Sequence, residues 1–498
     1  MNTSIIRYFL GKVMVITGAL MLLPIAVALI YRENEGIPFV IVACACAAIG
    51  ELLGIGKIKV DSFTIKEGSI VTGLSWILLS VAGCIPFVLT GEIPNFIDAL
   101  FETVSGFTTT GASVLSDVES LSHTALFWRS FTHWIGGMGV LVFILALMPL
   151  GTGSGKGGGA GLNLMKAESP GPSVGKLVPK IKSTAGWLYK IYAFLTGLEF
   201  ILLIIGKMRV FDALCMSFGT AGTGGFGILN SSCCDYSLYC QIVITVFMIL
   251  FGINFNFYFF IILRQFKKAI KMEEVQRYIG IIVLAIVCIA INIYHMCDGV
   301  VDAISKAAFQ VGSIITTTGF SSTDFDKWPE FSKTVLVMLM FCGACAGSTG
   351  GGIKVSRFMT WIKTMRKELG SYIHPRGIKK VMVDGKIVEH EVIRSINVYF
   401  AAFCAIFVVS VLLISLEGYD FTTNFTAVAA TINNIGPGLN KVGPTCNFGF
   451  FNPFSKMIFI FDMLAGRLEI YPMLMLFYPA VYKEFFKNVK KVKKSSKN

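Results

Sequence analysis

Charged side chains are scarce in this sequence. Asp, Glu, Lys and Arg make up 15% of the 498 residues, whereas 54% of the residues are hydrophobic and the mean hydropathy is +0.70. In soluble domains charged residues account for roughly a quarter of the chain. The composition therefore excludes an ordinary soluble domain and predicts an all-α integral membrane protein.

The residues that usually carry catalysis or bind metals are also few. The chain has five histidines, none at a metal-ligand spacing, so no zinc-type site is expected. No set of nucleophile, base and oxyanion donors can be assembled, which argues against an enzyme, and no cofactor is expected. The apolar N-terminal run is too long for a signal peptide and lacks a small-residue cleavage site, so it is expected to remain as a helix.

Two glycine-rich motifs imitate nucleotide-binding loops. Gly222, Gly224 and Gly227 satisfy GxGxxG, but no βαβ pattern surrounds them. The stretch GTGSGKGGGAG (151–161) has Gly157 after Lys156, where a phosphate loop needs Ser or Thr. A flexible cytoplasmic linker is the better interpretation of that stretch.

The thirteen cysteines give little indication of redox chemistry. Most lie inside apolar runs and are interpreted as small buried hydrophobes. Cys342 and Cys345 form a CxxC, but they lie in a glycine-rich membrane segment. Only Cys233, Cys234 and Cys240 fall in a loop where a disulfide could form.

Basic residues gather in the loops that link one helix pair to the next. The net charge is +13, and the basic stretches are 57–66, 156–182, 264–277, 354–386 and the tail from Lys483 to Lys497. By the positive-inside rule these stretches and both termini face the cytoplasm, in a multi-pass protein of the cell membrane. This distribution argues against nucleic-acid binding. The opposite loops are more acidic, which suits either a cation-attracting rim or ordinary solvated loops.

Four short polar segments, which we call the glycine segments, lie between long apolar runs. They read FTTTGA (107–112), AGTGGF (221–226), ITTTGF (315–320) and NNIGPG (433–438). Their shared glycines, Gly111, Gly225, Gly319 and Gly436, are 114, 94 and 117 residues apart. This period exceeds that of solenoid repeats and fits a unit of two membrane helices with a re-entrant loop. Four such units can enclose one pore.

The composition of the glycine segments suits an ion-selectivity filter. A cation that enters a bilayer must exchange its water shell for oxygen atoms, and a ring of inward-pointing backbone carbonyls supplies them. Glycine reaches positive φ without steric cost, and β-branched Thr is expected to hold its neighbours extended and to add a hydroxyl oxygen. A single TTTG is more often an ordinary turn, but four in the same context predict a filter.

The apolar runs predict ten spanning helices: 5–31, 37–56, 69–91, 126–150, 183–206, 238–263, 278–295, 331–362, 392–416 and 454–480. Between the helices of each later pair, a segment such as 95–105 is too short to span and suits a half-helix that returns through the glycine segment. The predicted fold is four pseudo-symmetric helix–pore loop–helix repeats around one central pore, plus an N-terminal two-helix hairpin. The divisions are 1–68 for the hairpin and linker, and 69–182, 183–277, 278–391 and 392–498 for the repeats.

Several longer motifs resemble one transporter family. FETVSGFTTTGASV, HWIGGMGVLV, FQVGSIITTTGFSSTDF, CAGSTGGGIKV, INNIGPGLN and AGRLEIYPML occur in that family's order over essentially the whole chain. The chain resembles the Trk/Ktr/HKT superfamily of potassium transporters, and most closely the TrkH-like membrane subunits of bacterial Trk uptake systems. The resemblance implies a potassium-selective, channel-like pore, a homodimer, and a cytoplasmic TrkA-like nucleotide-binding regulatory subunit.

The same resemblance implies which residues bind the ion. Potassium would be held around the shared glycine of each segment and the pair of residues before it. These are Thr109, Thr110 and Gly111; Thr223, Gly224 and Gly225; Thr317, Thr318 and Gly319; and Asn434, Ile435 and Gly436. The second segment departs from TTTG, and its Gly222 adds local freedom. In plant relatives a serine in the first filter accompanies sodium permeation, so four glycines favour potassium.

A glycine-dense stretch interrupts the second helix of the third repeat. GACAGSTGGG (343–352) contains Gly343, Gly347, Gly350, Gly351 and Gly352 and no bulky side chain, so it cannot hold a rigid helix. One interpretation is close helix packing through small residues. In the family that the chain resembles, this break is an intramembrane loop that blocks the pore and serves as a gate.

Arg467 lies near the middle of the last apolar run. A charge there costs about 2.5–3.5 kcal/mol on insertion scales, so it must face protein or water. Glu469 is two residues away, on another face of the helix, and is not expected to pair with Arg467. One interpretation is a salt bridge to another repeat. The resemblance favours the other, in which Arg467 lies near the pore constriction and opposes a passing cation.

The alternative function is that of a proton- or sodium-coupled secondary cation transporter with alternating access. Such carriers use paired broken helices around a buried acidic site. The candidates Glu199, Asp462 and Glu469 form no obvious paired set in the sequence. The fourfold repetition of the glycine segments therefore favours a pore.

Overall fold

The computed structural model describes residues 3–55, 65–139, 181–374 and 380–479. These parts are almost entirely helical, and their only strands form a two-residue hairpin of β1 (Met382–Val383) and β2 (Lys386–Ile387). The predicted basic stretches at 57–64 and 156–180, the 151–161 linker and the tail from 480 lie outside the described residues.

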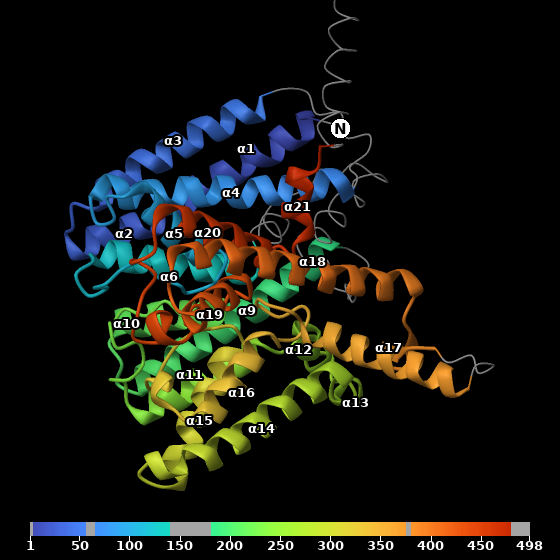
Figure 1. Ribbon diagram of the computed structural model, residues 1–498. Coiled ribbons are helices and arrows are strands. Elements are labelled where there is room, and N and C mark those ends of the chain that lie inside the picture. Colours follow the sequence, from blue (N-terminus) through green and yellow to red (C-terminus); the bar gives the residue numbers. More distant parts are fainter. Residues whose placement is uncertain (1–2, 56–64, 140–180, 375–379, 480–498) are drawn as a thin grey trace, which may run out of the picture.

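The N-terminal hairpin consists of three helices. The helices α1 (Thr3–Leu20) and α2 (Leu22–Tyr31) run as one 29-residue apolar unit, and α3 (Gly36–Gly54) packs back along them (Figure 1). Small residues bring α1 and α3 together, because a Cβ at Gly11 would lie 2.6 Å from the carbonyl oxygen of Gly50. This is the hairpin that the sequence predicts ahead of the repeats.

Four groups of helices follow, each containing one glycine segment. The first is α4 (Ile65–Thr90), α5 (Phe96–Phe107) and α6 (His123–Gly137); the second is α9 (Ile181–Ile205), α10 (Val210–Gly222), α11 (Leu238–Phe251) and α12 (Phe255–Ile262). The short helix α13 (Phe266–Ile270) leads to the third group: α14 (Glu273–Ile293), α15 (Val300–Ile315), α16 (Glu330–Met340) and α17 (Val355–Ile373). The fourth is α18 (His390–Ile414), α19 (Phe421–Ile432), α20 (Pro453–Arg467) and α21 (Tyr471–Phe477). The 3₁₀ turns are η1 (Tyr294–Met296), η2 (Phe325–Lys327), η3 (Ser415–Glu417) and η4 (Asn440–Val442).

The half-helix of each group ends at its glycine segment. These half-helices are α5, α10, α15 and α19, with 12, 13, 16 and 12 residues, too short to cross a bilayer. The first begins where the sequence predicts, since the Asn95 side chain accepts a hydrogen bond from the backbone N–H of Ile97 at 2.9 Å. Asp420 caps α19 in the same way through the N–H of Thr423.

The second helices of the second and fourth groups are broken, which corrects the single spans predicted at 238–263 and 454–480, and that of the third group is broken where the sequence predicts. The run 238–263 divides into α11 and α12, which are bent by 90° at residues 252–254. The run 331–362 divides into α16 and α17 around the glycine-rich stretch, and 454–480 divides at residues 468–470. Among the described residues, six helices are long and apolar enough to span, or seven if the bent pair counts as one.

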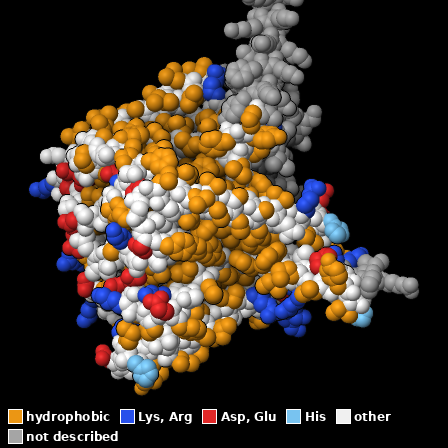
Figure 2. All heavy atoms as spheres, viewed as in Figure 1, with side chains coloured by type: hydrophobic (Ala, Val, Ile, Leu, Met, Phe, Trp, Pro, Cys, Tyr) orange, Lys and Arg blue, Asp and Glu red, His pale blue; other side chains and the backbone are white. Residues whose placement is uncertain are grey.

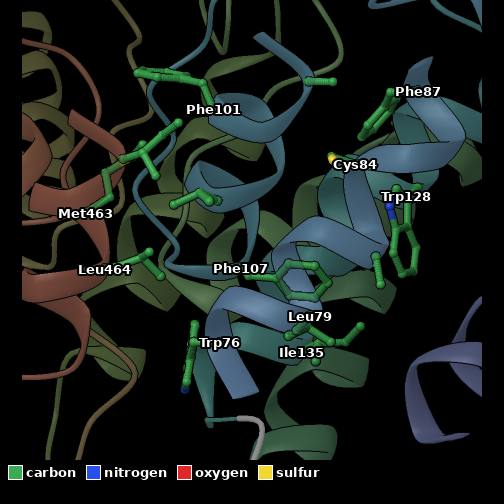
Figure 3. Close-up of a cluster of buried hydrophobic side chains, with 14 of the residues drawn as sticks. Trp76, Leu79, Cys84, Phe87, Phe101, Phe107, Trp128, Ile135, Met463 and Leu464 are labelled. Atoms are coloured by element: carbon green, nitrogen blue, oxygen red, sulfur yellow. The ribbon is translucent and has the colours of Figure 1, made fainter. Parts of the chain in front are cut away.

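The core of the first and fourth groups is aromatic. Figure 3 shows Phe101 and Phe107 of α5 between side chains of α4, α6 and α20. The Trp128 indole N–H donates to the carbonyl oxygen of Gly83 at 3.1 Å, and its ring lies edge-on to Phe107 with centroids 6.0 Å apart. These contacts fix the end of α5 and therefore the position of the first glycine segment.

The outer surface is suited to a bilayer. Large apolar side chains point outward, among them Leu29 at 76%, Val301 at 75% and Ile291 at 71% exposure. Figure 2 shows hydrophobic side chains over a broad band, with charged side chains gathered towards its two ends. Exposed apolar surface of this extent fits a lipid environment and no aqueous one.

Candidate functional site: the glycine segments and the loop beside them

The four glycine segments share one backbone geometry. In each, the residue before the shared glycine donates its N–H to the carbonyl five positions earlier in the half-helix. These bonds join Thr110 to Ser105 (2.9 Å), Gly224 to Gly219 (2.8 Å), Thr318 to Ser313 (2.8 Å) and Ile435 to Ala430 (2.8 Å). This bond closes a helix C-terminus in the Schellman motif, so four different sequences end their helices in the same way.

The turn that ends each half-helix places a β-branched residue or asparagine in the left-handed region. The φ angles are +54° at Thr109, +53° at Thr223, +59° at Thr317 and +56° at Asn434. The expectation that Thr would hold this backbone extended is therefore wrong for these three threonines. Left-handed φ at a β-branched residue is rare and costs about 1–3 kcal/mol, and it persists only where the surroundings enforce it.

The shared glycines bring the four segments into a closed ring. A Cβ at Gly111 would lie 2.1 Å from the Gly224 carbonyl oxygen, and one at Gly225 would lie 2.0 Å from that of Thr318. The contacts continue from Gly319 to the Ile435 oxygen at 2.0 Å, and from Gly436 to the Thr110 oxygen at 2.8 Å. Each segment thus abuts the next in chain order, and the fourth abuts the first.

Only glycine fits the shared position. All four glycines have positive φ, between +78° and +97°. At each of them a Cβ would lie within 2.8 Å of a carbonyl oxygen of the adjoining segment, so no larger residue fits. The structure therefore brings together the twelve residues that the sequence analysis assigns to the filter. The carboxyl ends of four half-helices meet at this ring, and the partial negative charge of helix C-termini favours a cation there.

The second segment keeps this geometry despite its different sequence. Gly222 and Gly224 pack against His133 of α6, with Cβ positions only 2.2 Å from the His133 carbonyl oxygen and 2.1 Å from its Nδ1. The His133 ring stacks on Phe226, with centroids 4.3 Å apart. The extra glycines thus make room for the histidine, which explains the departure from TTTG.

A buried ion pair beside the first segment escaped the sequence analysis. Glu102 of α5 accepts from Nε and Nη2 of Arg129 of α6, at 2.9 and 2.7 Å, and also binds Ser113 and the N–H of Val114. Both charged side chains are at most 2% exposed. Ser113 follows Gly111 by two positions, so the pair fixes the chain just after the segment. The only signal in the sequence is a Glu and an Arg inside apolar runs.

Gln310 occupies the matching place in the third group. It lies nine residues before Gly319, as Glu102 lies nine before Gly111. Its side-chain amide donates to Ser321 Oγ at 3.4 Å, and Ser321 follows Gly319 by two positions. The corresponding residues of the second and fourth groups are Met216 and Ala427. The ring is therefore braced by polar contacts on two opposite sides.

The stretch 343–352 forms a loop that lies against the ring. The N–H of Gly351 donates to Thr317 Oγ1 at 2.6 Å, and a Cβ at Gly351 would lie 2.8 Å from Cβ of Asn434. A Cβ at Gly350 would lie 3.1 Å from the Thr316 carbonyl oxygen. The predicted break in the helix is therefore present, and the loop contacts the third and fourth segments directly.

The loop is held from the side by α14 and by the bend between α11 and α12. The Glu274 carboxylate accepts from the N–H of Ala346 at 2.6 Å and from that of Ser356 at 3.2 Å. The N–H of Phe255 donates to the Gly347 oxygen at 3.0 Å. Glu274 therefore anchors the loop by accepting hydrogen bonds from its backbone. The position of Glu274 in a basic stretch of the sequence does not predict this role.

Arg467 ties the loop to the first group. It lies at the end of α20 rather than in mid-helix, and its guanidinium donates to the oxygens of Thr349 at 2.8 Å, Gly136 at 2.5 Å and Gly137 at 2.7 Å. Glu469 pairs instead with Arg357 of α17, as expected from its separate direction. The guanidinium thus contacts backbone oxygens of the first and third helix groups beside the ring.

Lys354 and Arg357 are buried, which corrects the assignment of 354–386 as a basic stretch in water. Lys354 is 8% exposed and donates from Nζ to the carbonyl oxygens of Gly350 and Gly351, and Arg357 is 4% exposed. Two charges at the start of the stretch therefore stabilise the loop and α17. The other two acids considered for a coupled carrier are not part of this loop. Asp462 accepts from Ser410 at 2.8 Å, and Glu199 is buried in α9.

The thirteen cysteines, all within the described residues, are free, including Cys233, Cys234 and Cys240. The described residues also contain no cluster of three or more His, Cys, Asp or Glu side chains suited to a metal ion. The oxygen atoms gathered at this site are therefore mainly those of the backbone and of Thr and Asn side chains.

Comparisons with known proteins identify the family. The TrkH family model, described as a cation transport protein, matches residues 37–485. The Trk system potassium uptake protein TrkH of Salmonella typhimurium is 35% identical over 492 residues, covering 97% of this chain and all of that protein. TrkG of Escherichia coli is 34% identical, covering 96% and 99%.

A solved structure matches the fold as well. The crystal structure of the potassium transporter TrkH from Vibrio parahaemolyticus superposes with a TM-score of 0.85 at 32% identity, covering 97% of this chain and 100% of that one. The matches are to transporters rather than to enzymes. The chain therefore belongs to the TrkH family of cation transport proteins.

Proposed function

We propose that this chain takes up potassium across the cell membrane through a channel-like selective pore formed by the four glycine segments. The observation that carries the proposal is the closed ring, in which each shared glycine abuts the carbonyl oxygen of the next segment. Its relatives in Salmonella and Escherichia are named as potassium uptake proteins. Four matching helix ends around one point give a dehydrated cation similar oxygens from all sides.

The ion would be coordinated by backbone oxygens around each shared glycine. The proposed ligands are Thr109, Thr110 and Gly111; Thr223, Gly224 and Gly225; Thr317, Thr318 and Gly319; and Asn434, Ile435 and Gly436. These residues alternate between left-handed and other backbone conformations, and such alternation turns successive peptide groups towards a common centre.

The 343–352 loop is proposed as the gate. Gly343, Gly347, Gly350, Gly351 and Gly352 allow it to reach the ring, and its contacts to Thr317 and Asn434 support this role. Arg467 would add a positive charge beside the ion path. Opening then requires release of the loop from the ring, Glu274 and Arg467.

A regulatory partner and a second copy complete the proposal. The chain's own described residues contain no nucleotide-binding fold, and the resemblance implies a cytoplasmic TrkA-like nucleotide-binding subunit and a homodimer. The basic stretch 264–277 supports a cytoplasmic position for that end of the bundle. Both termini would then lie in the cytoplasm.

The alternative, ion-coupled transport by alternating access, makes a different prediction for flux. A pore conducts potassium in proportion to its driving force without an obligatory counter-ion, whereas a carrier needs the coupled proton or sodium gradient. Potassium flux into proteoliposomes at several potentials, with and without a pH or sodium gradient, separates the two. Flux that stops without either gradient would support the carrier.

The first prediction tests the filter through Gly111. Gly111→Ser should lower the preference for potassium over sodium, because its Cβ would lie 2.1 Å from the Gly224 oxygen and must displace part of the ring. Gly418→Ser is the matched control, since Gly418 has a similar φ of +79° and nothing within 4 Å of its Cβ position. Relative rubidium and sodium flux in proteoliposomes is the measurement. An unchanged ratio in folded Gly111→Ser protein would contradict the filter assignment.

A further inference from the structure

A basic cluster lies where α13 meets α14, away from the ring. Five exposed Arg or Lys side chains occur within 14 residues, and none pairs with a carboxylate among the described residues: Arg264, Lys267, Lys268, Lys271 and Arg277. Lys and Arg side chains are visible at this place in Figure 2, where Figure 1 shows α13. The acids beside the cluster are engaged elsewhere, because Glu273 pairs with Lys363, Glu274 binds the 343–352 loop, and Asp384 accepts from the backbone N–H of Glu273 at 2.8 Å. The cluster therefore keeps its positive charge.

An apolar groove of about 730 Å³ begins beside this cluster. Its floor is a stripe of α14 that includes Ile279, Gly280, Val283 and Leu284, and Gln276 is its only polar side chain. The spacing i, i+1, i+4, i+5 places these residues on one face of the helix. Val283 and Leu284 are 54% and 65% exposed, so this face looks outward into the apolar band.

The geometry places the charges at one end of the groove. Ile270 lines the groove, and Lys271 follows it directly at the end of α13. Arg277 lies three and seven residues before Gly280 and Leu284, so it shares their face of α14 one turn closer to the cluster. A ligand that fills the groove thus meets positive charge at only one of its ends.

We propose that this groove binds one anionic phospholipid. An acyl chain lies along the α14 stripe, and the phosphate accepts hydrogen bonds from Lys271 and Arg277. An ammonium and a guanidinium without acidic partners attract a lipid of net negative charge over a zwitterionic one, whose own cation opposes them. A soluble acidic protein satisfies the charges but leaves the apolar stripe uncovered, so the lipid matches both halves of the site.

The charge half of the site is tested with a matched pair of variants. Lys271→Gln with Arg277→Gln is compared with Lys380→Gln with Arg394→Gln, which removes one exposed Lys and one exposed Arg elsewhere. Native mass spectrometry with added dioleoylphosphatidylglycerol measures binding, and dioleoylphosphatidylcholine is the neutral lipid. The first variant should bind phosphatidylglycerol about 30-fold more weakly, equivalent to about 2 kcal/mol for two charges. The control variant should bind it as the wild type does.

The apolar half is tested at Gly280. A Cβ at Gly280 or at Gly197 of α9 meets nothing within 4 Å, so both helices accept a larger residue. Gly280→Phe fills the groove and should abolish the selective retention of phosphatidylglycerol, whereas Gly197→Phe should leave it unchanged. The proposal would be overturned if the Gly280→Phe variant and the Lys271/Arg277 variant both retained phosphatidylglycerol at wild-type levels. It would equally be overturned if the charge variant kept the lipid but lost binding of the system's purified regulatory subunit.

Discussion

At the scale of single residues, the glycines explain how the ring closes and the threonines show what it costs. Thr109, Thr223 and Thr317 accept a left-handed φ that glycine would adopt freely. The Thr317 hydroxyl accepts from the N–H of Gly351 and the Thr223 hydroxyl donates to the carbonyl oxygen of Gly222, whereas the buried Thr109 hydroxyl has no partner among the described residues. At Thr223 and Thr317 the strain is therefore offset by contacts that only a hydroxyl-bearing side chain can make.

Arg467→Ala should give folded protein with faster potassium flux, by about fivefold if the barrier falls by about 1 kcal/mol. The substitution removes a positive charge beside the proposed ion path, and the effect should be largest at low ionic strength. It also removes the bonds from the guanidinium to Thr349, Gly136 and Gly137. Proteoliposome flux at two salt concentrations is the measurement.

Arg467→Lys separates the two causes. Lysine keeps the positive charge but lacks the planar guanidinium, whose N–H groups bind backbone oxygens of the first and third helix groups at the same time. If Arg467→Lys conducts near the wild-type rate, the effect of the alanine substitution is due to the lost charge. If it conducts like Arg467→Ala, the effect is due to the lost hydrogen bonds from the guanidinium to the backbone. An alanine variant that is unstable, or that conducts more slowly, would contradict the pore-side role.

Whether the role of a residue can be predicted from the sequence depends on how strongly its chemistry limits the places where it can lie. The shared glycines are predictable because four short polar segments recur between long apolar runs, each with a glycine at the matching place, and the close approach of a neighbouring carbonyl oxygen explains each glycine. Glu102 and Arg129 are not, because an isolated charge in an apolar run indicates burial without naming its partner. Glu274 is not, because it lies in the basic stretch 264–277 and resembles a solvated residue there. Lys354 is misassigned for a related reason, since it directly follows the apolar run and resembles a residue of the basic linker.

At the scale of elements, the half-helices and the break at 343–352 are predictable from the sequence, whereas the breaks at 252–254 and 468–470 are not. A short segment between two long apolar runs suits only a half-helix, as found for α5. The 90° bend between α11 and α12 occurs at Gly252, Ile253 and Asn254. Gly and Asn favour helix ends, but one of each inside a long apolar run does not by itself predict a bend. The bend exists because Gly252 and Phe255 bind the backbone of the 343–352 loop, and that tertiary contact overrides local propensity.

Deletion of Ala344 to Gly351 should raise potassium flux in the absence of a regulatory partner and leave ion selectivity intact. The stretch can be removed with little strain, because the Gly343 N–H donates to the Ile353 oxygen at 2.8 Å and the ends are already adjacent. Flux and the rubidium-to-sodium ratio are measured on the same vesicles. Folded protein with unaltered or lower flux would favour a packing role for the loop.

Glu274→Gln provides a milder test that keeps the loop. The carboxylate accepts from two backbone N–H groups, and a charged acceptor contributes more than a neutral amide to such bonds. A weaker anchor should raise flux without the partner, by less than the deletion does. Lower flux in folded Glu274→Gln protein would contradict the anchoring role of this residue.

At the scale of the whole molecule, charge and apolar surface divide the protein along one axis. Figure 2 shows the apolar band between two charged ends, and the half-helices α5, α10, α15 and α19 begin at the end opposite α13 and α17. The basic stretch 264–277 lies at the α13 end. From the positive-inside rule we propose that this end faces the cytoplasm and that the loops around the ring face outward.

The native cysteines can test this orientation. Cys234 and Cys446 are exposed in loops that follow the second and fourth glycine segments, and Cys297 is half-buried after α14. A membrane-impermeant maleimide should therefore label Cys234 and Cys446 in intact cells, and Cys297 more weakly. Replacement of all three by Ser should abolish labelling from outside, because the other exposed cysteines among the described residues, Cys44 of α3 and Cys404 of α18, lie in apolar helices that are expected to face lipid. Labelling that appears only in inside-out vesicles would invert the topology.

The pH dependence of that labelling adds an independent check on the environment of Cys234. Partial burial, and secondarily the charge of Asp235, raise the pKa of the Cys234 thiol above its usual range. The thiolate is the reactive form, so a raised pKa lowers the thiolate fraction at neutral pH and delays its increase until higher pH. Cys234 should therefore react slowly at pH 7 and steadily faster towards pH 9 and above. Asp235→Asn should bring this rise to lower pH, and a rate for Cys234 that is already maximal at pH 7 would contradict the partial burial of its thiol.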